Sequence, residues 1–263
     1  MVKPKMQKII KHSNKSVNTI IFIHGFPFEH HMWKNQIDYF KKTYTCITYD
    51  IRGLGQSPAD GGQFTMEDLV DDLYGVISKA KVVKPVICGL SMGGYISLRS
   101  VEKNENIFSG LILCDTKAES DTNAAKLKRA AGIKLINEIG GPEYVAAFVP
   151  ECFSPNSLSH IDKEYRVILE RSLKTDPIGL KGCLLAMAGR TDTTSCLTKI
   201  KIPALVLCGE EDNFSPPSAM HAMAEMIKNS EFHIIVNAGH MSPVENPEVV
   251  NTYIAGFLKK VFA

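Results

Sequence analysis

The sequence predicts an α/β fold: a mostly parallel central sheet flanked by helices, with a helical lid inserted before the last two strands. Three observations carry this expectation. Short apolar runs alternate with helix-like segments up to about residue 114, which is typical of parallel strands joined by crossover helices. From about residue 115 to 199 the patterns are helical, with no convincing strand. The strand pattern then resumes and continues to the end of the chain.

These patterns divide the chain into a core and an insert. We expect residues 1–118 and 197–263 to form the α/β core and residues 119–196 to form a helical lid over the carboxyl edge of the sheet. An independent helical domain is the alternative, and it is less favoured because no linker-like composition flanks the insert.

Strands are expected where apolar and β-branched residues run without interruption, since strands buried on both faces have this pattern. These runs are residues 19–23, 44–49, 86–90, 110–114, 202–208 and 231–236, with residues 8–11 as a short edge strand.

Helices are expected where apolar residues recur at helical spacing. Thr65 is a candidate N-cap, with acidic residues in the turn that follows it. Apolar residues at every fourth position from Leu127 to Ile139 indicate a helix, and the segment Gly140-Gly141-Pro142 is expected to end it. Further helices are expected at residues 32–40, 64–80, 165–173, 178–188, 217–226 and 247–261, and directly after Ser91.

Composition limits the functions that the chain can have. Its 263 residues suit one large α/β domain, and a net charge of +2 is too small to suggest binding to nucleic acid or to a membrane surface. The basic start of the chain is expected to be a solvated edge. It contains Lys3, Lys5, Lys8, Lys11 and Lys15.

The cysteines and the N-terminus bear on location. There are seven cysteines, an odd number, with no CxxC pair and no spacing suited to zinc. The pattern indicates a reducing compartment. Neither a signal peptide nor a membrane-spanning stretch is recognisable, so a cytoplasmic protein is expected. The oligomeric state stays open.

The segment Gly89-Leu90-Ser91-Met92-Gly93 is the first sign of chemistry. A tight turn between strand and helix lifts the serine hydroxyl clear of the sheet, and the flanking glycines let strand and helix pass closely. Met92 supplies an N–H at the start of the helix, where an anion is favoured. Because glycine and serine are common, a plain glycine-rich turn is the alternative reading.

Two further groups follow in the order that a serine nucleophile requires. Gly209-Glu210-Glu211-Asp212 comes after one strand, and Gly239-His240 comes after the last. The carboxyl ends of parallel strands meet at one edge, so Ser91, an acid and His240 are expected to converge there. Asp212 is the first choice for the acid. Glu210, Glu211 and Asp115 compete with it, and Asp115 is the second choice.

Each residue type has a chemical task. His240 would take the proton of Ser91 as it attacks, and the carboxylate would hold the imidazole in the correct tautomer. The N–H groups of Met92 and Phe26 are the expected oxyanion donors. No metal or cofactor is needed for this chemistry.

Three other polar residues near this edge have simpler explanations. His24 lies within the turn that contains Phe26, and a role in stabilising that turn is favoured over proton transfer. Asp50 and Arg52 are expected to pin the loop that contains them.

With these residues in view, the chain resembles the α/β-hydrolase family, in particular its branch of lid-bearing esterases, 3-oxoadipate enol-lactonases and perhydrolases. The resemblance implies Ser91, Asp212 and His240 as catalytic triad and Phe26 and Met92 as oxyanion hole. Serine at position 91 argues against the related dehalogenases and epoxide hydrolases, which have aspartate there. The motifs are His24-Gly25-Phe26-Pro27, the segment from Asp50 to Ser57, the Ser91 turn, Gly209 to Asp212 and Gly239-His240.

The first hypothesis is therefore a serine hydrolase that cleaves a small ester or lactone through an acyl-enzyme. The second uses the same triad for thioester or carbon–carbon bond hydrolysis, or for perhydrolysis. The third and least favoured is a non-enzymatic sensor of small molecules that keeps the triad. Fold alone does not separate these possibilities.

Overall fold

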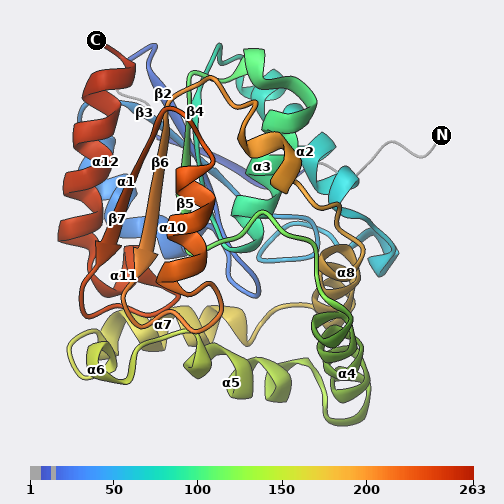
Figure 1. The fold of residues 1–263 in the computed structure, drawn as a ribbon. Coiled ribbons are helices and arrows are strands. Elements are labelled where there is room, and N and C mark those ends of the chain that lie inside the picture. Colours follow the sequence, from blue (N-terminus) through green and yellow to red (C-terminus); the bar gives the residue numbers. More distant parts are fainter. Residues whose placement is uncertain (1–6, 13–15) are drawn as a thin grey trace.

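The computed structural model describes residues 7–12 and 16–263, and in these residues it contains one seven-stranded sheet (Figure 1). The strand order is β1-β3-β2-β4-β5-β6-β7, with β1 antiparallel to β3 and every other pair parallel. The expected mostly parallel sheet is thus confirmed. The strands are β1 (Ile9–His12), β2 (Thr19–Ile23), β3 (Thr45–Tyr49), β4 (Val86–Leu90), β5 (Gly110–Cys114), β6 (Ala204–Gly209) and β7 (Ser230–Ile235).

Every residue of strands β2 to β6 is buried, which explains why these strands read as continuous apolar runs. At the centre of the sheet Ile21 pairs with Ile47 on one side and with Ile87 on the other. The two edges are different: β1 and most of β7 are partly exposed. Lys3, Lys5 and Lys15 of the basic start lie outside the described residues.

Helices cover both faces of the sheet (Figure 1). On one side α1 (Lys34–Phe40) packs beside α12 (Pro247–Val261), and on the other α2 (Met66–Ala80) packs beside α3 (Met92–Asn104). The other helical segments before β5 and after β6 are α10 (Pro217–Glu225), α11 (Ser242–Glu245), η1 (His30–Trp33), η2 (Asp60–Gly62) and η3 (Glu105–Ile107).

Between β5 and β6 the chain forms six helices and no strand in the described structure, and we call them the inserted helices. Figure 1 shows α4 to α8 beyond the ends to which the arrows of β6 and β7 point. The six are α4 (Asn123–Ile139), α5 (Gly141–Glu151), α6 (Pro155–Leu158), α7 (Asp162–Ser172), α8 (Pro177–Ala188) and α9 (Thr194–Leu197).

The apolar repeat that predicted helix α4 does not form its buried face. Leu127 is 71% exposed and Ile139 is 46% exposed, whereas Gly132 and Ile136 are buried. Gly132 allows a close approach, because a Cβ there would lie 3.3 Å from Tyr144 and 3.4 Å from Leu184. The repeat therefore located the helix correctly, but the residues that pack against the protein are Gly132 and Ile136, each one position after a residue of the repeat.

Two absences concern the described residues alone. No helix among them has the length and apolar character that a bilayer-spanning segment needs. All seven cysteines are described, buried and free, without a disulfide between any of them.

Candidate active site

Ser91 occupies a strained turn between β4 and α3. Its backbone has φ of 53° and ψ of −115°, in a region that residues other than glycine rarely adopt. The turn is tight on both sides: a Cβ on Gly89 would lie 2.3 Å from the Gly93 oxygen, and one on Gly93 would lie 2.2 Å from the Ile23 oxygen. Only glycine fits either position, so the two glycines fix where the serine is presented.

Asp212 and His240 form a hydrogen-bonded pair. Asp212 follows β6, His240 lies between β7 and α11, and the His240 Nδ1 atom is 2.9 Å from Asp212 Oδ2. Since an ionised carboxylate only accepts, Nδ1 carries a proton, and in this tautomer of the neutral ring Nε2 keeps its lone pair. The histidine is 7% exposed and the aspartate 2%, so the pair is shielded from water.

The Asp212 carboxylate is held by its own loop. Its Oδ1 accepts from the N–H of Phe214 at 2.8 Å and of Ser215 at 3.1 Å, and its Oδ2 accepts from Ser215 Oγ at 2.6 Å. Burial raises the pKa of Asp212, but the charge and hydrogen bond of His240 and the bonds from Ser215 outweigh it, so this pKa lies below its ordinary value. The carboxylate is therefore charged at neutral pH.

Ser91 reaches the same edge through the neighbouring strand. Its N–H donates to the Cys114 oxygen at 3.0 Å, and Thr116 Oγ1 donates to the Ser91 oxygen at 2.8 Å. Its side chain is half-buried. Among the described residues no hydrogen bond joins Ser91 Oγ to His240, so the structure contains the Asp212–His240 pair but no bond from it to the Ser91 hydroxyl.

Asp115 does not bond to the histidine. Its Oδ1 accepts from the Gly209 N–H at 2.7 Å, and its Oδ2 accepts from Ser242 Oγ at 2.5 Å. Burial, followed by the charge of Asp212, raises the pKa of Asp115 well above its ordinary value. This residue thus joins β6 to the start of α11 and is occupied there.

The other two acids that compete with Asp212 also point elsewhere. Glu210 accepts from the Asn237 N–H at 3.2 Å. Glu211 accepts from Ser154 Oγ at 2.6 Å and from Asn156 Nδ2 at 3.0 Å.

The expected oxyanion donors lie at the ends of two adjacent strands. β2 and β4 pair in register up to Ile23 and Gly89, so the turns that carry Phe26 and Met92 are neighbours. Within the described part of the chain, neither the Phe26 N–H nor the Met92 N–H donates to a protein acceptor. Both side chains are buried, at 4% and 0% exposure, which leaves two backbone donors in a water-poor region.

His24 supports the first of these turns. Its Nδ1 donates to the Gly25 oxygen at 2.9 Å, and its Nε2 accepts from the Ile51 N–H at 2.9 Å. Burial lowers the pKa of His24, so the ring is neutral. Its contacts agree with the structural role expected from the sequence.

Asp50 and Arg52 hold the loop that follows β3, as expected, but with separate partners. The Asp50 carboxylate accepts from His30 Nδ1 at 2.7 Å and from the Gln56 N–H at 2.9 Å. Arg52 binds Asp72 through two nitrogens, at 2.9 and 2.7 Å.

A cleft of about 510 Å³ opens next to the Asp212–His240 pair. It is lined by α4, α5 and the loop after β6, and its wall includes Phe148 and Phe214. The Phe214 ring lies 5.0 Å from the His240 ring, and the Phe148 ring lies 5.7 Å from that of Phe26. Aromatic side chains of the cleft wall thus contact both His240 and Phe26.

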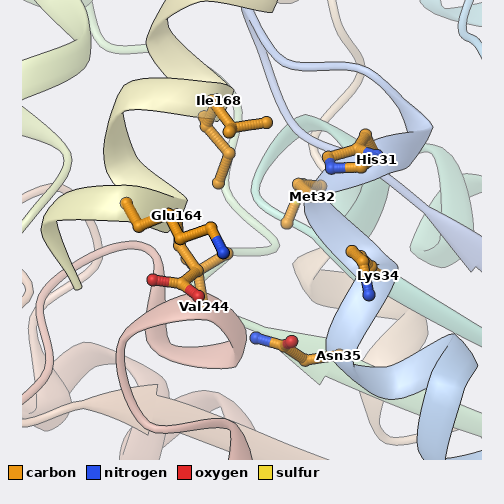
Figure 2. Close-up of a pocket in the computed structure, with 9 residues that line it drawn as sticks. His31, Met32, Lys34, Asn35, Glu164, Ile168 and Val244 are labelled. Atoms are coloured by element: carbon orange, nitrogen blue, oxygen red, sulfur yellow. The ribbon is translucent and has the colours of Figure 1, made fainter.

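A second hollow, of about 230 Å³, lies between η1, α7 and α11 (Figure 2). Met32, Glu164, Ile168 and Val244 are among its lining residues. None of the expected catalytic residues lines it, so it has no part in the chemistry expected of Ser91.

Two groups of side chains in the described structure come close enough to hold a cation: Glu29 with His30 and Asp50, and Asp115 with Cys208 and Asp212. The carboxylates of both groups already accept the hydrogen bonds of neighbouring residues. The chemistry of these donors therefore does not point to a metal.

Three polar residues of the site escaped the sequence analysis: Ser215, Ser242 and Glu245. Ser215 Oγ contacts both Asp212 and His240, at 2.6 and 3.4 Å, and Glu245 accepts from the N–H groups of Gly239 and Met241. Ser215 follows the aspartate by three residues, a spacing at which an aspartate often accepts from a turn. No comparable local signal marks the other two.

Comparisons with known proteins agree with this architecture. The model of the alpha/beta hydrolase family matches residues 20–252. The solved structure of an esterase from Thermogutta terrifontis is 33% identical, with a TM-score of 0.93 over 98% of this chain and 94% of that one. The 3-oxoadipate enol-lactonase 2 of Acinetobacter baylyi is 25% identical over 245 residues, covering 92% of this chain and 88% of its own. An enol-lactonase from Burkholderia xenovorans, at 23% identity and a TM-score of 0.89 over 96% of both chains, shares the fold.

Proposed function

Because the chain belongs to the α/β hydrolase family, we propose that it is a serine hydrolase that cleaves small carboxylic esters or lactones through an acyl-enzyme. Its similarity to an esterase and to an enol-lactonase supports this class of substrate. The observation that carries the proposal is the buried Asp212–His240 pair, whose Nε2 is left free to act as a base.

In the first half of the reaction, Ser91 Oγ attacks the ester carbonyl carbon while His240 Nε2 takes the hydroxyl proton. Asp212 stabilises the imidazolium that forms, since its charged oxygen already accepts from Nδ1. The N–H groups of Phe26 and Met92 donate to the developing oxyanion. The imidazolium then protonates the departing alcohol oxygen, which leaves the acyl group on Ser91.

In the second half, water replaces the alcohol. His240 takes one proton of the water, whose oxygen attacks the acyl carbonyl, and the same N–H groups stabilise the second oxyanion. When this intermediate collapses, the proton returns to Ser91 Oγ and the carboxylic acid leaves.

We propose that the inserted helices form the lid of this site. Their position beyond the strand ends supports this role (Figure 1). So does the cleft beside His240, because α4 and α5 supply much of its wall. A cleft of about 510 Å³ has the size of a small-molecule site.

The test is the variant Ser91→Ala on short p-nitrophenyl esters. Loss of the nucleophile removes the acyl-enzyme route, so we expect turnover to fall by roughly 10⁶-fold, to the limit of detection. The wild-type protein should become labelled at one serine by a fluorophosphonate, and mass spectrometry of the digest should place the label on Ser91.

The circular dichroism spectrum of the variant provides the control, since it should match that of the wild type. Turnover retained in a folded Ser91→Ala protein would refute the proposal. Thioesters, β-diketones and hydrogen peroxide with acetate, assayed beside the esters, would reveal whether the same residues favour one of the related chemistries.

A further inference from the structure

A buried glutamate lies beside the candidate histidine without a cationic partner. Glu245, at the end of α11, is 8% exposed, and no ion pair in the described structure includes it. Burial raises its pKa, and hydrogen bonds from Ser157 and three backbone N–H groups counter the effect. A buried carboxylate is costly unless its oxygens are satisfied by donors, so the placement of those donors indicates what the residue does.

One oxygen of Glu245 holds the loop that carries the histidine. Oε1 accepts from the Gly239 N–H at 2.9 Å and from the Met241 N–H at 3.0 Å. These are the residues immediately before and after His240. A single oxygen thus holds the N–H groups of the residues on both sides of the candidate base, and with them the backbone from which its ring extends.

The other oxygen of Glu245 holds the inserted helices. Oε2 accepts from the Ser154 N–H at 2.8 Å and from the Ser157 hydroxyl. Both residues belong to the short segment 154–157, which begins α6. The contact between segment and loop is close, because a Cβ on Gly239 would lie 2.7 Å from the Ser154 nitrogen.

The same segment also binds the loop of the candidate acid. Glu211, the residue before Asp212, accepts from Ser154 Oγ at 2.6 Å and from Asn156 Nδ2 at 3.0 Å. Segment 154–157 therefore bonds to two glutamates, one on the loop of each member of the acid–base pair. No other part of the inserted helices in the described structure is bonded to both of these loops.

We propose that Glu245 is a positioning residue, through which segment 154–157 of the inserted helices holds the His240 loop in its catalytic geometry. Glu211 anchors the same segment on the Asp212 loop. The inserted helices then do more than cover the substrate, since they set the orientation of the base. The inference depends on the function proposed above, in which His240 is that base.

The test compares Glu245→Gln with the wild type on a p-nitrophenyl ester. The amide keeps one accepting oxygen but turns an NH2 group towards two donors on the other side. We expect kcat to fall roughly 10- to 100-fold, because small misplacements of a catalytic group have effects of this size. KM should change less than about twofold, since no substrate contact is lost.

Three variants distinguish positioning from a general loss of stability. Ser157→Ala removes one donor to Glu245 and should lower kcat by a few-fold. In the double variant with Glu245→Gln it should lower kcat no further, because the two changes break the same contact. Glu248→Gln is the matched control: this exposed glutamate on the next helix should leave kcat unchanged. All are assayed at 25 °C, with the folded fraction measured by circular dichroism.

The rate of labelling by a fluorophosphonate adds a readout that is independent of substrate, and it should fall in proportion to kcat. Wild-type kcat in folded Glu245→Gln, or a loss found only in KM, would overturn the inference while leaving the proposed function intact. Additive effects of Glu245→Gln and Ser157→Ala would also overturn it. Activity in Ser91→Ala would instead refute the function itself.

Discussion

Two buried aspartates end neighbouring parallel strands, and only their hydrogen bonds distinguish them. Asp212 bonds to His240 and has a pKa below its ordinary value, whereas Asp115 bonds to Ser242 and has a pKa well above it. The charge of Asp212 contributes to the raised pKa of Asp115, and both residues are 2% exposed or less. A single negative charge is therefore favoured at these two carboxyl groups, and the hydrogen bond from His240 places it on Asp212.

This difference predicts how asparagine substitutions will act. Asp212→Asn places an amide beside Nδ1, which favours the wrong tautomer of His240, and kcat should fall roughly 10³- to 10⁴-fold. Asp115→Asn keeps an oxygen that can accept from Ser242, so kcat should fall less than about tenfold. Steady-state kinetics on one ester substrate measures both. The reverse ranking would identify Asp115 as the acid.

At the scale of a single element, helix α2 shows how local sequence sets a boundary. Thr65 Oγ1 accepts from the Asp68 N–H at 3.3 Å, and the Asp68 carboxylate accepts from the Thr65 N–H at 2.7 Å. These two bonds form a capping box, which satisfies two backbone donors at the start of the helix. The buried side of the helix then packs against the core with Leu69, Leu73 and Val76.

Removing the cap should destabilise the protein by about 1 kcal/mol, because Thr65→Ala leaves the Asp68 N–H without its partner. Urea unfolding followed by circular dichroism measures this. Ser78→Ala is the matched control: Ser78 is exposed inside the same helix, and alanine should be neutral or slightly stabilising there. Equal losses in the two variants would contradict a specific role of the cap.

At the scale of the whole molecule, an ionic cluster joins the sheet to the inserted helices. His30 Nδ1 lies 2.9 Å from Glu29 and 2.7 Å from Asp50, and Arg171 of α7 binds Glu29 at 2.6 and 3.1 Å. Burial lowers the pKa of His30, but the two carboxylates outweigh it and raise that pKa to about 9. The charged histidine is thus a stabilising part of the fold.

The sign of the pH dependence follows from this raised pKa. The folded protein holds the proton more tightly than the unfolded chain, so the stabilisation is complete below pH 6.5 and is lost as the pH rises towards about 9. It amounts to on the order of 3 kcal/mol at most. The free energy of unfolding, measured in urea between pH 6 and 9.5, should fall more steeply in the wild type than in His30→Gln. Parallel curves would show that the cluster adds no such dependence.

Much of this molecule was readable from its sequence, because the signals concerned are local. The uninterrupted apolar run at residues 19–23, the N-cap at Thr65 and the tight turn at Ser91 each depend on neighbouring residues only. The expected fold class and family are confirmed by the sheet and by the comparisons. The residues expected at the site lie at the carboxyl ends of parallel strands, and this edge follows from strand order alone.

Local patterns in the chain therefore predicted which segments form helices and strands, and which strand ends could hold catalytic residues. The folded arrangement was needed to distinguish Asp212 from Asp115, because the choice depends on which carboxylate meets a histidine from another strand. It also placed Glu245 between the His240 loop and segment 154–157. Ser157 of this segment is 88 residues from Glu245 along the chain. Contacts between distant residues leave no periodic mark in the sequence, since they arise only when packing brings separate loops together.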